Sequence, residues 1–100
     1  MQDISVTELK KRMDAGEKLF IIDVRESHEF EEFNIGAQLI PLSELPDKLA
    51  EFEKYKNDEI IVHCRSGMRS NNAKMYMIGE GFTHVRNLIG GMMAWQSEID

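Results

Sequence analysis

The sequence predicts a single α/β domain with a central, mainly parallel sheet and helices on both faces. Three observations predict it. Short apolar runs rich in branched residues, typical of strands buried on both faces, alternate with stretches of helical spacing. No Asn-Gly type of hairpin signal separates these runs, so helices should connect the strands. One hundred residues, 42% of them hydrophobic, suffice for one core, and we assign residues 1–100 to one domain.

Four segments are predicted strands. The runs 19–24 (LFIIDV) and 59–63 (EIIVH) are nearly continuous apolar stretches, and 84–88 is the predicted last strand. A further short strand is expected within 39–42, where Pro41 closes it because proline cannot donate to the ladder.

Helical spacing accounts for the segments between the strands. Ser5 and Glu8 have the form of a capping box, and Gly16 ends the helix that follows it. Pro46 is tolerated only in the first turn of its helix. Helices or helical turns are expected over 6–15, 27–33, 43–55, 68–80 and from Gly90-Gly91 onward.

Composition narrows the function. The chain has one cysteine, which excludes an internal disulfide and makes that thiol the first candidate for chemistry. The net charge of −6 argues against general affinity for nucleic acid or anionic membranes. No apolar run approaches the ~20 residues of a membrane span and nothing resembles an export signal, so we expect a cytoplasmic protein without membrane association.

The segment from Cys64 to Ser70 is the candidate active loop. It lies between a predicted strand and a predicted helix, at the sheet edge where α/β proteins bind ligands. Gly67 permits a backbone turn through which amide hydrogens converge on the sulfur. Because 60–79 contains basic residues, including Arg65 and Arg69, and no acidic one, the loop should stabilise a thiolate or persulfide, or the oxyanion of a donor such as thiosulfate.

Inert packing is the alternative for this cysteine, because free cysteines are among the most buried residues. The six residues after Cys64 are Arg-Ser-Gly-Met-Arg-Ser. Two arginines, two serines and a glycine make a poor core segment and a good anion-binding loop. The composition of the loop therefore favours a functional cysteine.

The chain resembles the rhodanese homology domain over essentially its whole length. The motifs that carry the resemblance are Asp-Val-Arg at 23–25 with Glu29-Phe30, Gly36-Ala37, Ile40-Pro41-Leu42, the loop 64–70, and a closing set of Gly81-Phe82, Val85, Leu88, Gly90-Gly91 and Ala94-Trp95. The resemblance implies a rhodanese-like fold. It also implies transfer of sulfur from a donor such as thiosulfate to a thiol or cyanide through a persulfide on Cys64.

Two features qualify the resemblance. Four residues separate Cys64 from Arg69. The loop from Cys64 to Arg69 therefore has six residues, the length that the resemblance associates with sulfur transfer. The related phosphatases and arsenate reductases have loops of seven residues, so a phosphatase or arsenate reductase is the less favoured alternative. The turn Phe33-Asn34-Ile35-Gly36 is shorter than the family's and lacks its histidine, which puts the mouth of the site and its donor preference in question.

The predicted site comprises the nucleophile and the residues around it. Cys64 is the catalytic residue, and the residues expected to bind substrate are Arg65, Ser66, Gly67, Met68, Arg69 and Ser70. Asp23 and Arg25 end a strand at the same edge and are expected to form a supporting ion pair, with substrate contact by Arg25 as the alternative. Arg69 either binds the donor's sulfonate or holds a carboxylate such as Asp23. Arg65 is the stronger candidate for substrate contact.

No cofactor or metal is expected. A single cysteine makes no zinc motif, and His28 and His84 have no partners at ligand spacing. His63 precedes Cys64 on a strand, so its side chain should point to the opposite face.

The expected partners are a small sulfur donor and a thiol acceptor, free or carried by a protein. That acceptor must come from outside, because the chain has no second cysteine to resolve a persulfide. A carrier or regulatory module that acts with a protein partner and turns over poorly is the second functional alternative.

Overall fold

A parallel sheet with strand order β2-β1-β3-β4 forms the centre of the domain. The computed structural model describes residues 2–100. Its strands are β1 (Ile21–Asp23), β2 (Gln38–Leu39), β3 (Glu59–His63) and β4 (His84–Asn87). The predicted α/β class with a parallel sheet is confirmed.

Two of the predicted strands are longer than the observed ones. The segment 19–24 contributes only β1. The strand expected within 39–42 is β2, which begins one residue earlier, at Gln38, and ends at Leu39, two residues before Pro41. Backbone pairing nevertheless continues beyond β1, because the Val24 N–H donates to the His63 carbonyl at 3.0 Å and the Ile40 N–H donates to the Asp23 carbonyl at 2.9 Å.

The helices lie close to their predicted positions, with one exception. They are α1 (Val6–Asp14), α2 (Ser27–Glu32), α4 (Met68–Gly79) and α5 (Gly91–Glu98). The single helix predicted over 43–55 is wrong. That stretch consists of a 3-10 turn (Leu42–Glu44), the short helix α3 (Leu45–Lys48) and a 3-10 helix (Leu49–Tyr55).

The spacing of apolar residues explains the 3-10 conformation. Leu49, Phe52 and Tyr55 recur every third residue, and a helix with three residues per turn places them on one face. The rings of Phe52 and Tyr55 both pack edge-on against Phe20, with centroids 5.4 and 5.3 Å away. Packing of the aromatic rings thus selects the tighter helix over an α-helix.

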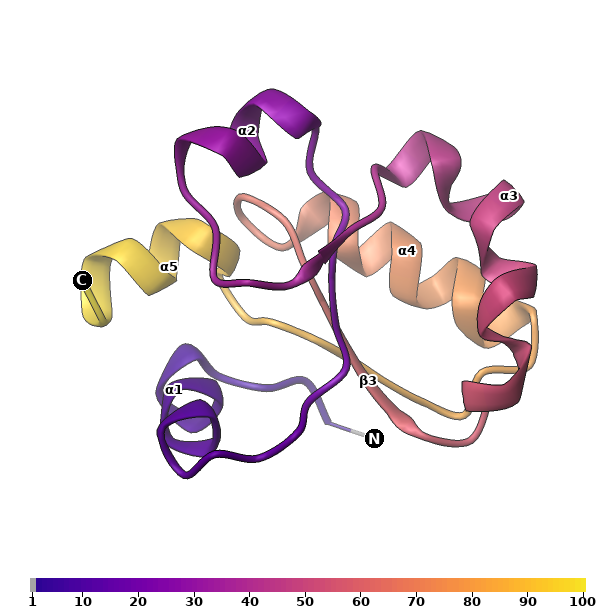
Figure 1. The fold of residues 1–100 in the computed structure, drawn as a ribbon, viewed down its shortest axis with the longest axis horizontal. Coiled ribbons are helices and arrows are strands. Elements are labelled where there is room, and N and C mark those ends of the chain that lie inside the picture. Colours follow the sequence, from indigo (N-terminus) through magenta and orange to yellow (C-terminus); the bar gives the residue numbers. More distant parts are fainter. Residues whose placement is uncertain (1) are drawn as a thin grey trace.

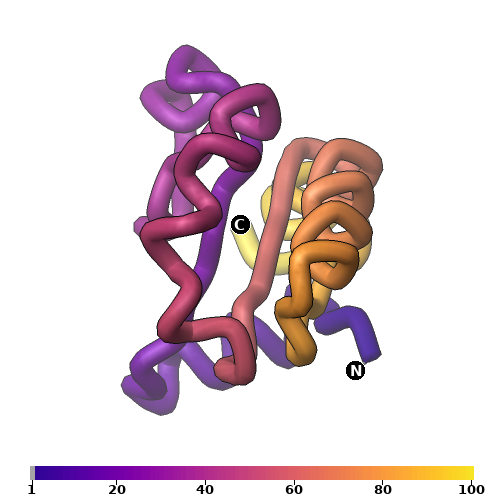
Figure 2. Tube along the Cα trace, turned by 90° about the vertical axis from the view of Figure 1, so that its right-hand side faces the viewer, coloured from indigo at the N-terminus to yellow at the C-terminus, as the bar shows by residue number. Residues whose placement is uncertain are grey.

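Helices cover both faces of the sheet, as predicted. On one face Ile22, Ile60 and Val62 pack against α4 and the segment 42–55. On the other face Ile21 and Ile61 pack against α1 and α5. Figure 1 shows α1 and α5 on one side of β3 and α3 and α4 on the other. In Figure 2 the segment 42–55 and α4 face the viewer, with α5 behind α4.

One edge of this layered structure gathers the chain ends that matter for chemistry. Asp23 ends β1, His63 ends β3 and Asn87 ends β4, so three parallel strands finish at the same edge. Both α4 and α5 begin there as well. Cys64 follows β3 directly and therefore lies beneath two helix N-termini.

Candidate active site

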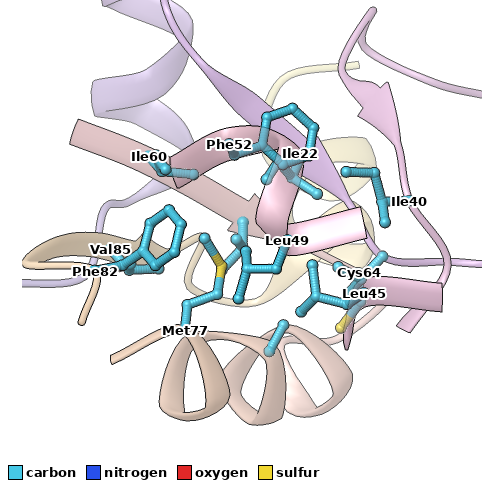
Figure 3. Packing of buried hydrophobic residues seen from close by; sticks show 13 residues of the cluster. Ile22, Ile40, Leu45, Leu49, Phe52, Ile60, Cys64, Met77, Phe82 and Val85 are labelled. Atoms are coloured by element: carbon cyan, nitrogen blue, oxygen red, sulfur yellow. The ribbon is translucent and has the colours of Figure 1, made fainter. Parts of the chain in front are cut away.

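Cys64 lies at the boundary between the core and the loop. It belongs to the apolar cluster that also contains Leu45 and Met77, and only 1% of its surface is exposed. In Figure 3 Cys64 occupies the opposite end of this cluster from Phe82 and Val85. The core fixes its backbone, while the loop that follows surrounds its sulfur.

Three donors surround the Cys64 sulfur. The Gly67 N–H and the Ser70 N–H donate to Sγ at 3.1 and 3.4 Å, and the Ser70 hydroxyl oxygen lies 3.3 Å from Sγ. Burial raises the pKa of Cys64, but hydrogen bonds from the Ser70 side chain and from the amides of Ser70, Gly67 and Ser66 outweigh it and hold the pKa below its usual value. The convergence of loop amides on the sulfur is therefore present.

Gly67 makes this convergence possible. It immediately precedes α4 and has a φ of +106°, in the region that residues with a side chain avoid. This conformation turns its N–H toward Sγ as the chain enters the helix.

The start of α5 holds the loop from behind. The N–H groups of Met92 and Met93 donate to the carbonyls of Cys64 and Arg65, both at 2.9 Å. A Cβ built on Gly91 would lie 2.5 Å from the Cys64 carbonyl oxygen, so only glycine allows this approach. Because the amides of α5 bind these carbonyls, the carbonyls point away from the sulfur and the loop amides are left to face it.

Arg69 closes the loop onto α2. Its Nη1 and Nη2 donate to the two carboxylate oxygens of Glu29 at 2.7 and 2.9 Å. This pair lowers the pKa of Glu29 to about 2, chiefly through the Arg69 hydrogen bond. Of the two roles expected for Arg69, the structure places it on a carboxylate. That carboxylate belongs to Glu29, whereas Asp23, the suggested partner, is bound by another arginine.

Asp23 and Arg25 form a buried pair. Arg25 Nε and Nη2 donate to the Asp23 carboxylate over 2.8–3.1 Å, and the Arg25 N–H donates to it at 3.0 Å. Arg25 Nη2 also donates to the Phe33 carbonyl at 2.7 Å. The pair thus anchors the shortened turn after α2, which Asn34 further closes by accepting from the Gly36 N–H at 2.9 Å.

The remaining loop residues face outward. Arg65 and Ser66 are exposed, and Met68 is 77% exposed. Arg65 lines a cleft of about 480 Å³ together with Arg25, His28, Glu29, Glu32, Phe33, Met92, Met93 and Gln96. Ser66, Gly67 and Met68 line a second cleft beside Ile89.

His63 points away from the sulfur. Strand alternation places its side chain on the same face as Ile61, opposite Cys64, as predicted. Its ring is fully buried, and neither nitrogen has a hydrogen-bond partner within residues 2–100; Nε2 lies 3.7 Å from Asp23 Oδ2. Burial lowers the pKa of His63 to about 4, so the ring is neutral near pH 7.

The charge expected around Cys64 is largely neutralised. Arg69 pairs with Glu29, and Lys74 pairs with Asp3 at 2.7 Å. Of the three basic residues in 60–79, only Arg65 lacks an ion pair within the part of the chain that the structure describes. Neutral hydrogen-bond donors, rather than a basic segment, therefore surround the sulfur.

Sequence reasoning missed Asn87. This residue ends β4, and its side chain contacts both Gly67 and Ser70. The available signal was an asparagine near the carboxyl end of the predicted strand 84–88, because the carboxyl ends of parallel strands lie at the same edge as Cys64.

The site is that of the rhodanese class, in which a strand ends at a cysteine whose loop folds round its sulfur. The rhodanese-like domain model matches residues 5–98, and the chain belongs to this family. It is similar to the Bacillus subtilis protein named "Putative sulfurtransferase YtwF", with 41% identity over 98% of this chain and 93% of that protein.

Further relatives agree in sequence and fold. The chain is 38% identical to the Bacillus subtilis protein named "Putative sulfur carrier protein YrkF", and the match covers 98% of this chain and 52% of that protein. The crystal structure of SSP1007 from Staphylococcus saprophyticus superposes with a TM-score of 0.86 at 33% identity, over 99% of this chain and 97% of that one.

The human single-domain sulfurtransferase TSTD1 superposes with a TM-score of 0.84 at 28% identity, over 98% of this chain and 97% of that one. The family and these names support sulfur transfer as the general activity. No helix within residues 2–100 is both long and apolar enough to cross a membrane.

Proposed function

We propose that this chain is a sulfurtransferase that carries sulfur as a persulfide on Cys64. The observation that carries the proposal is the convergence of the Gly67 amide, the Ser70 amide and the Ser70 hydroxyl on the sulfur of the chain's one cysteine. These donors favour an anionic sulfur, and the thiolate is the nucleophilic form.

In the first half-reaction, the Cys64 thiolate attacks the outer sulfur of a donor such as thiosulfate. A bond forms between Sγ and that sulfur, while the bond between the outer sulfur and the sulfonate sulfur breaks. The electron pair of the broken bond leaves with sulfite. The products are a Cys64 persulfide anion and sulfite, with total charge unchanged.

In the second half-reaction, an acceptor thiolate or cyanide attacks the terminal sulfur of the persulfide. The bond between Sγ and that sulfur breaks, and its electrons return to Cys64 as the thiolate. The acceptor leaves as a persulfide or as thiocyanate. Because the chain has no second cysteine, this acceptor comes from outside.

The loop residues divide these tasks by position. The amides of Gly67 and Ser70 donate to the anionic sulfur, and the Ser66 amide also favours its charged form. Arg65 is exposed and without an ion pair among the described residues, so it is free to bind the donor's sulfonate. Met68 is exposed beside the second cleft, which Ser66 and Gly67 also line.

The other charged residues support the loop. Arg69 anchors it to α2 through Glu29, and the Asp23–Arg25 pair fixes the turn at the edge of the mouth. Because these guanidinium groups are already held by carboxylates, we assign them no substrate.

A donor panel tests this proposal. After incubation with thiosulfate, mass spectrometry should detect one added sulfur atom on the wild-type chain, removable with cyanide, and none on Cys64→Ser. Arg65→Gln should keep the modification but require more thiosulfate to reach it, because the sulfonate loses its cation. Ser66→Ala is the matched control, since it removes no charge and leaves the Ser66 amide in place.

An unmodified wild-type thiol with thiosulfate and with small organic persulfides would contradict the proposal. Hydrolysis of an aryl phosphate by the wild type and not by Cys64→Ser would instead assign the site to the phosphatase and arsenate reductase class.

A sulfur carrier that acts with a protein partner is the second candidate. The similarity to YrkF, named as a sulfur carrier, favours it. A carrier would gain the persulfide at one equivalent per chain but form thiocyanate slowly. Comparing the amount of bound sulfur with the steady-state rate of thiocyanate formation distinguishes the two functions.

A further inference from the structure

Asn87 bridges the two residues whose donors bind the Cys64 sulfur. Its side chain is at the carboxyl end of β4, and only 7% of the residue is exposed. Asn87 Nδ2 donates to the Gly67 carbonyl at 3.0 Å, and Oδ1 lies 2.6 Å from the Ser70 hydroxyl oxygen. One amide thus contacts both sides of the sulfur-binding loop.

The orientation of this amide follows from its neighbours. With the amide reversed, two carbonyl oxygens would lie 3.0 Å apart with no hydrogen between them. The Asn87 backbone is also held, because its N–H donates to Asp3 Oδ1 at 2.9 Å and Asp3 in turn pairs with Lys74. Oδ1 is therefore a fixed acceptor facing Ser70.

Ser70 has one hydroxyl hydrogen and two acceptors for it. Asn87 Oδ1 is 2.6 Å away and Cys64 Sγ is 3.3 Å away. A hydroxyl donates only one hydrogen, so the two acceptors compete. The shorter distance indicates that the hydrogen points to Asn87 while the sulfur is an uncharged thiol, and the thiol hydrogen can then point to the Ser70 oxygen.

We propose that Asn87 is a positioning residue that holds the Ser70 hydroxyl in the thiol state and releases it to the sulfur when the sulfur becomes anionic. The inference rests on the proposed function only for the identity of the reacting sulfur. When the thiolate forms, the hydroxyl turns to Sγ and Asn87 Oδ1 loses this donor. An unpartnered buried oxygen is unfavourable, so Asn87 opposes stabilisation of the thiolate.

This opposition matters for sulfur transfer. In the persulfide the charge resides on the terminal sulfur and Sγ is neutral, so the Ser70 hydrogen returns to Asn87. The network therefore stabilises the persulfide relative to the thiolate and keeps the thiolate a stronger nucleophile, because nucleophilicity falls as thiol pKa falls.

The charged groups around the network remain paired throughout. Arg69 interacts electrostatically with the anionic sulfur and forms an ion pair with Glu29. Behind Asn87, Asp3 forms an ion pair with Lys74 and also interacts electrostatically with Arg86. None of these pairs exchanges a hydrogen with Ser70, so the competition is confined to Ser70, Asn87 and Cys64.

A double-mutant cycle on the Cys64 pKa tests the proposal. The pKa is measured from the pH dependence of alkylation by iodoacetamide in wild type, Ser70→Ala, Asn87→Ala and the double variant. Ser70→Ala should raise the pKa in the Asn87→Ala background by about one unit more than in wild type, because the hydroxyl then serves only the sulfur. Equal increments in both backgrounds would overturn the proposal.

The cycle cancels any general loosening of the loop caused by Asn87→Ala. It also needs no sulfur donor, so absent persulfide formation would count against the proposed function and leave this inference standing.

A second measurement avoids the buried substitution. In the wild-type chain, the NMR resonances of the Asn87 side-chain amide should shift with pH as Cys64 titrates, since Oδ1 loses the Ser70 hydrogen. In Ser70→Ala that shift should disappear, although the sulfur still becomes charged. A shift of the same size in both proteins would mean that Asn87 senses only the charge and would reject the exchange of the hydrogen bond.

Discussion

At the scale of single residues, the candidate site depends on neutral donors more than on charge. The two amides and one hydroxyl around Sγ come from Gly67 and Ser70, whereas Arg69 is held by Glu29. Such dipoles stabilise an anion in a buried site without adding an unpaired charge. The reactivity of Cys64 should therefore respond sharply to backbone geometry.

Gly67→Ala tests this dependence on geometry. The positive φ of Gly67 is strained for alanine, so the loop should relax and turn the Gly67 N–H away from the sulfur. We expect the Cys64 pKa to rise by roughly one unit, which corresponds to the loss of one hydrogen bond to a charged acceptor. The pH profile of iodoacetamide alkylation measures it.

Gly79→Ala is the matched control for this substitution. Gly79 lies at the end of α4 without a positive φ, and nothing lies within 4 Å of a Cβ built there. It should leave the alkylation profile unchanged and stabilise the fold by up to about 1 kcal/mol. If both variants alkylate like wild type, the conformation of Gly67 is unimportant for the sulfur.

The residues of the loop could be predicted from sequence, but their partners could not. The position of Cys64 after a buried strand and the composition of 64–70 were sufficient to identify the loop. Glu29 and Asn87 lie 35 residues before and 23 residues after Cys64 in the chain. Nothing local indicates which arginine a distant carboxylate will bind, and this is why Asp23 was suggested for Arg69 in place of Glu29.

At the scale of elements, the N-terminus of α5 orients the candidate active loop. Its first amides bind the carbonyls of Cys64 and Arg65, and the amides of the loop are thereby left for the sulfur. Gly90-Gly91 was recognised from sequence as the start of a helix. Its contact with the loop depends on how α5 packs across the end of β3, which only the folded chain defines.

Gly91→Ala should disrupt this contact. A Cβ there would lie 2.5 Å from the Cys64 carbonyl oxygen and 2.6 Å from that of Arg65, so α5 or the loop must move. We expect the free energy of unfolding to fall by more than about 2 kcal/mol, and we expect Cys64 to be alkylated more slowly than in the wild type at neutral pH. Urea denaturation and alkylation at neutral pH measure the two effects.

Gly16→Ala is the control that separates the steric clash expected in Gly91→Ala from the strain of a positive φ. Gly16 also has a positive φ, of +80°, but nothing lies within 4 Å of its Cβ position. It should cost about 1 kcal/mol and leave alkylation unchanged. Equal losses of unfolding free energy in Gly16→Ala and Gly91→Ala would show that the close contact between α5 and the loop contributes nothing to stability beyond backbone strain.

At the scale of the whole molecule, buried and paired titratable groups make the fold sensitive to acid. The pKa of His63 is lowered to about 4 by burial, and the pKa of Glu59 is lowered to about 2 by its hydrogen bonds from Arg12. Glu59 opens β3 and also binds Arg86 of β4 at 3.0 Å, so it joins α1 to the sheet.

These groups act in two pH windows. A carboxylate with a lowered pKa stabilises the fold above its unfolded value, and that contribution is lost as pH falls from 4.5 toward 2 for Glu29 and Glu59. A histidine with a lowered pKa stabilises the fold above 6.5, and this is lost as pH falls from 6.5 toward 4. His63 therefore dominates the upper window.

His63→Leu should remove most of the pH dependence of the unfolding free energy in the upper window. Between about pH 7.5 and about pH 5 the wild type should lose about 2 kcal/mol of unfolding free energy through His63, because the unfolded chain binds a proton that the fold excludes. The variant should lose little over the same range. Urea denaturation at the two pH values provides the comparison.

His28→Gln is the control, because the exposed His28 side chain on α2 remains in water in both states. It should retain the wild-type dependence on pH. An unchanged slope in His63→Leu would mean that another group is responsible for the loss of stability.

By itself, the sequence determined the α/β class and the order of the strands and helices, and it singled out Cys64 to Ser70 as the candidate active loop. These follow from local periodicity and from the chemistry of adjacent residues. The tertiary structure decided that α5 supports the loop, that Glu29 and Asp3 pair with Arg69 and Lys74, and that the Asn87 side chain contacts both Gly67 and Ser70. Such contacts join residues far apart in the chain, and their distances are set by how helices and strands pack.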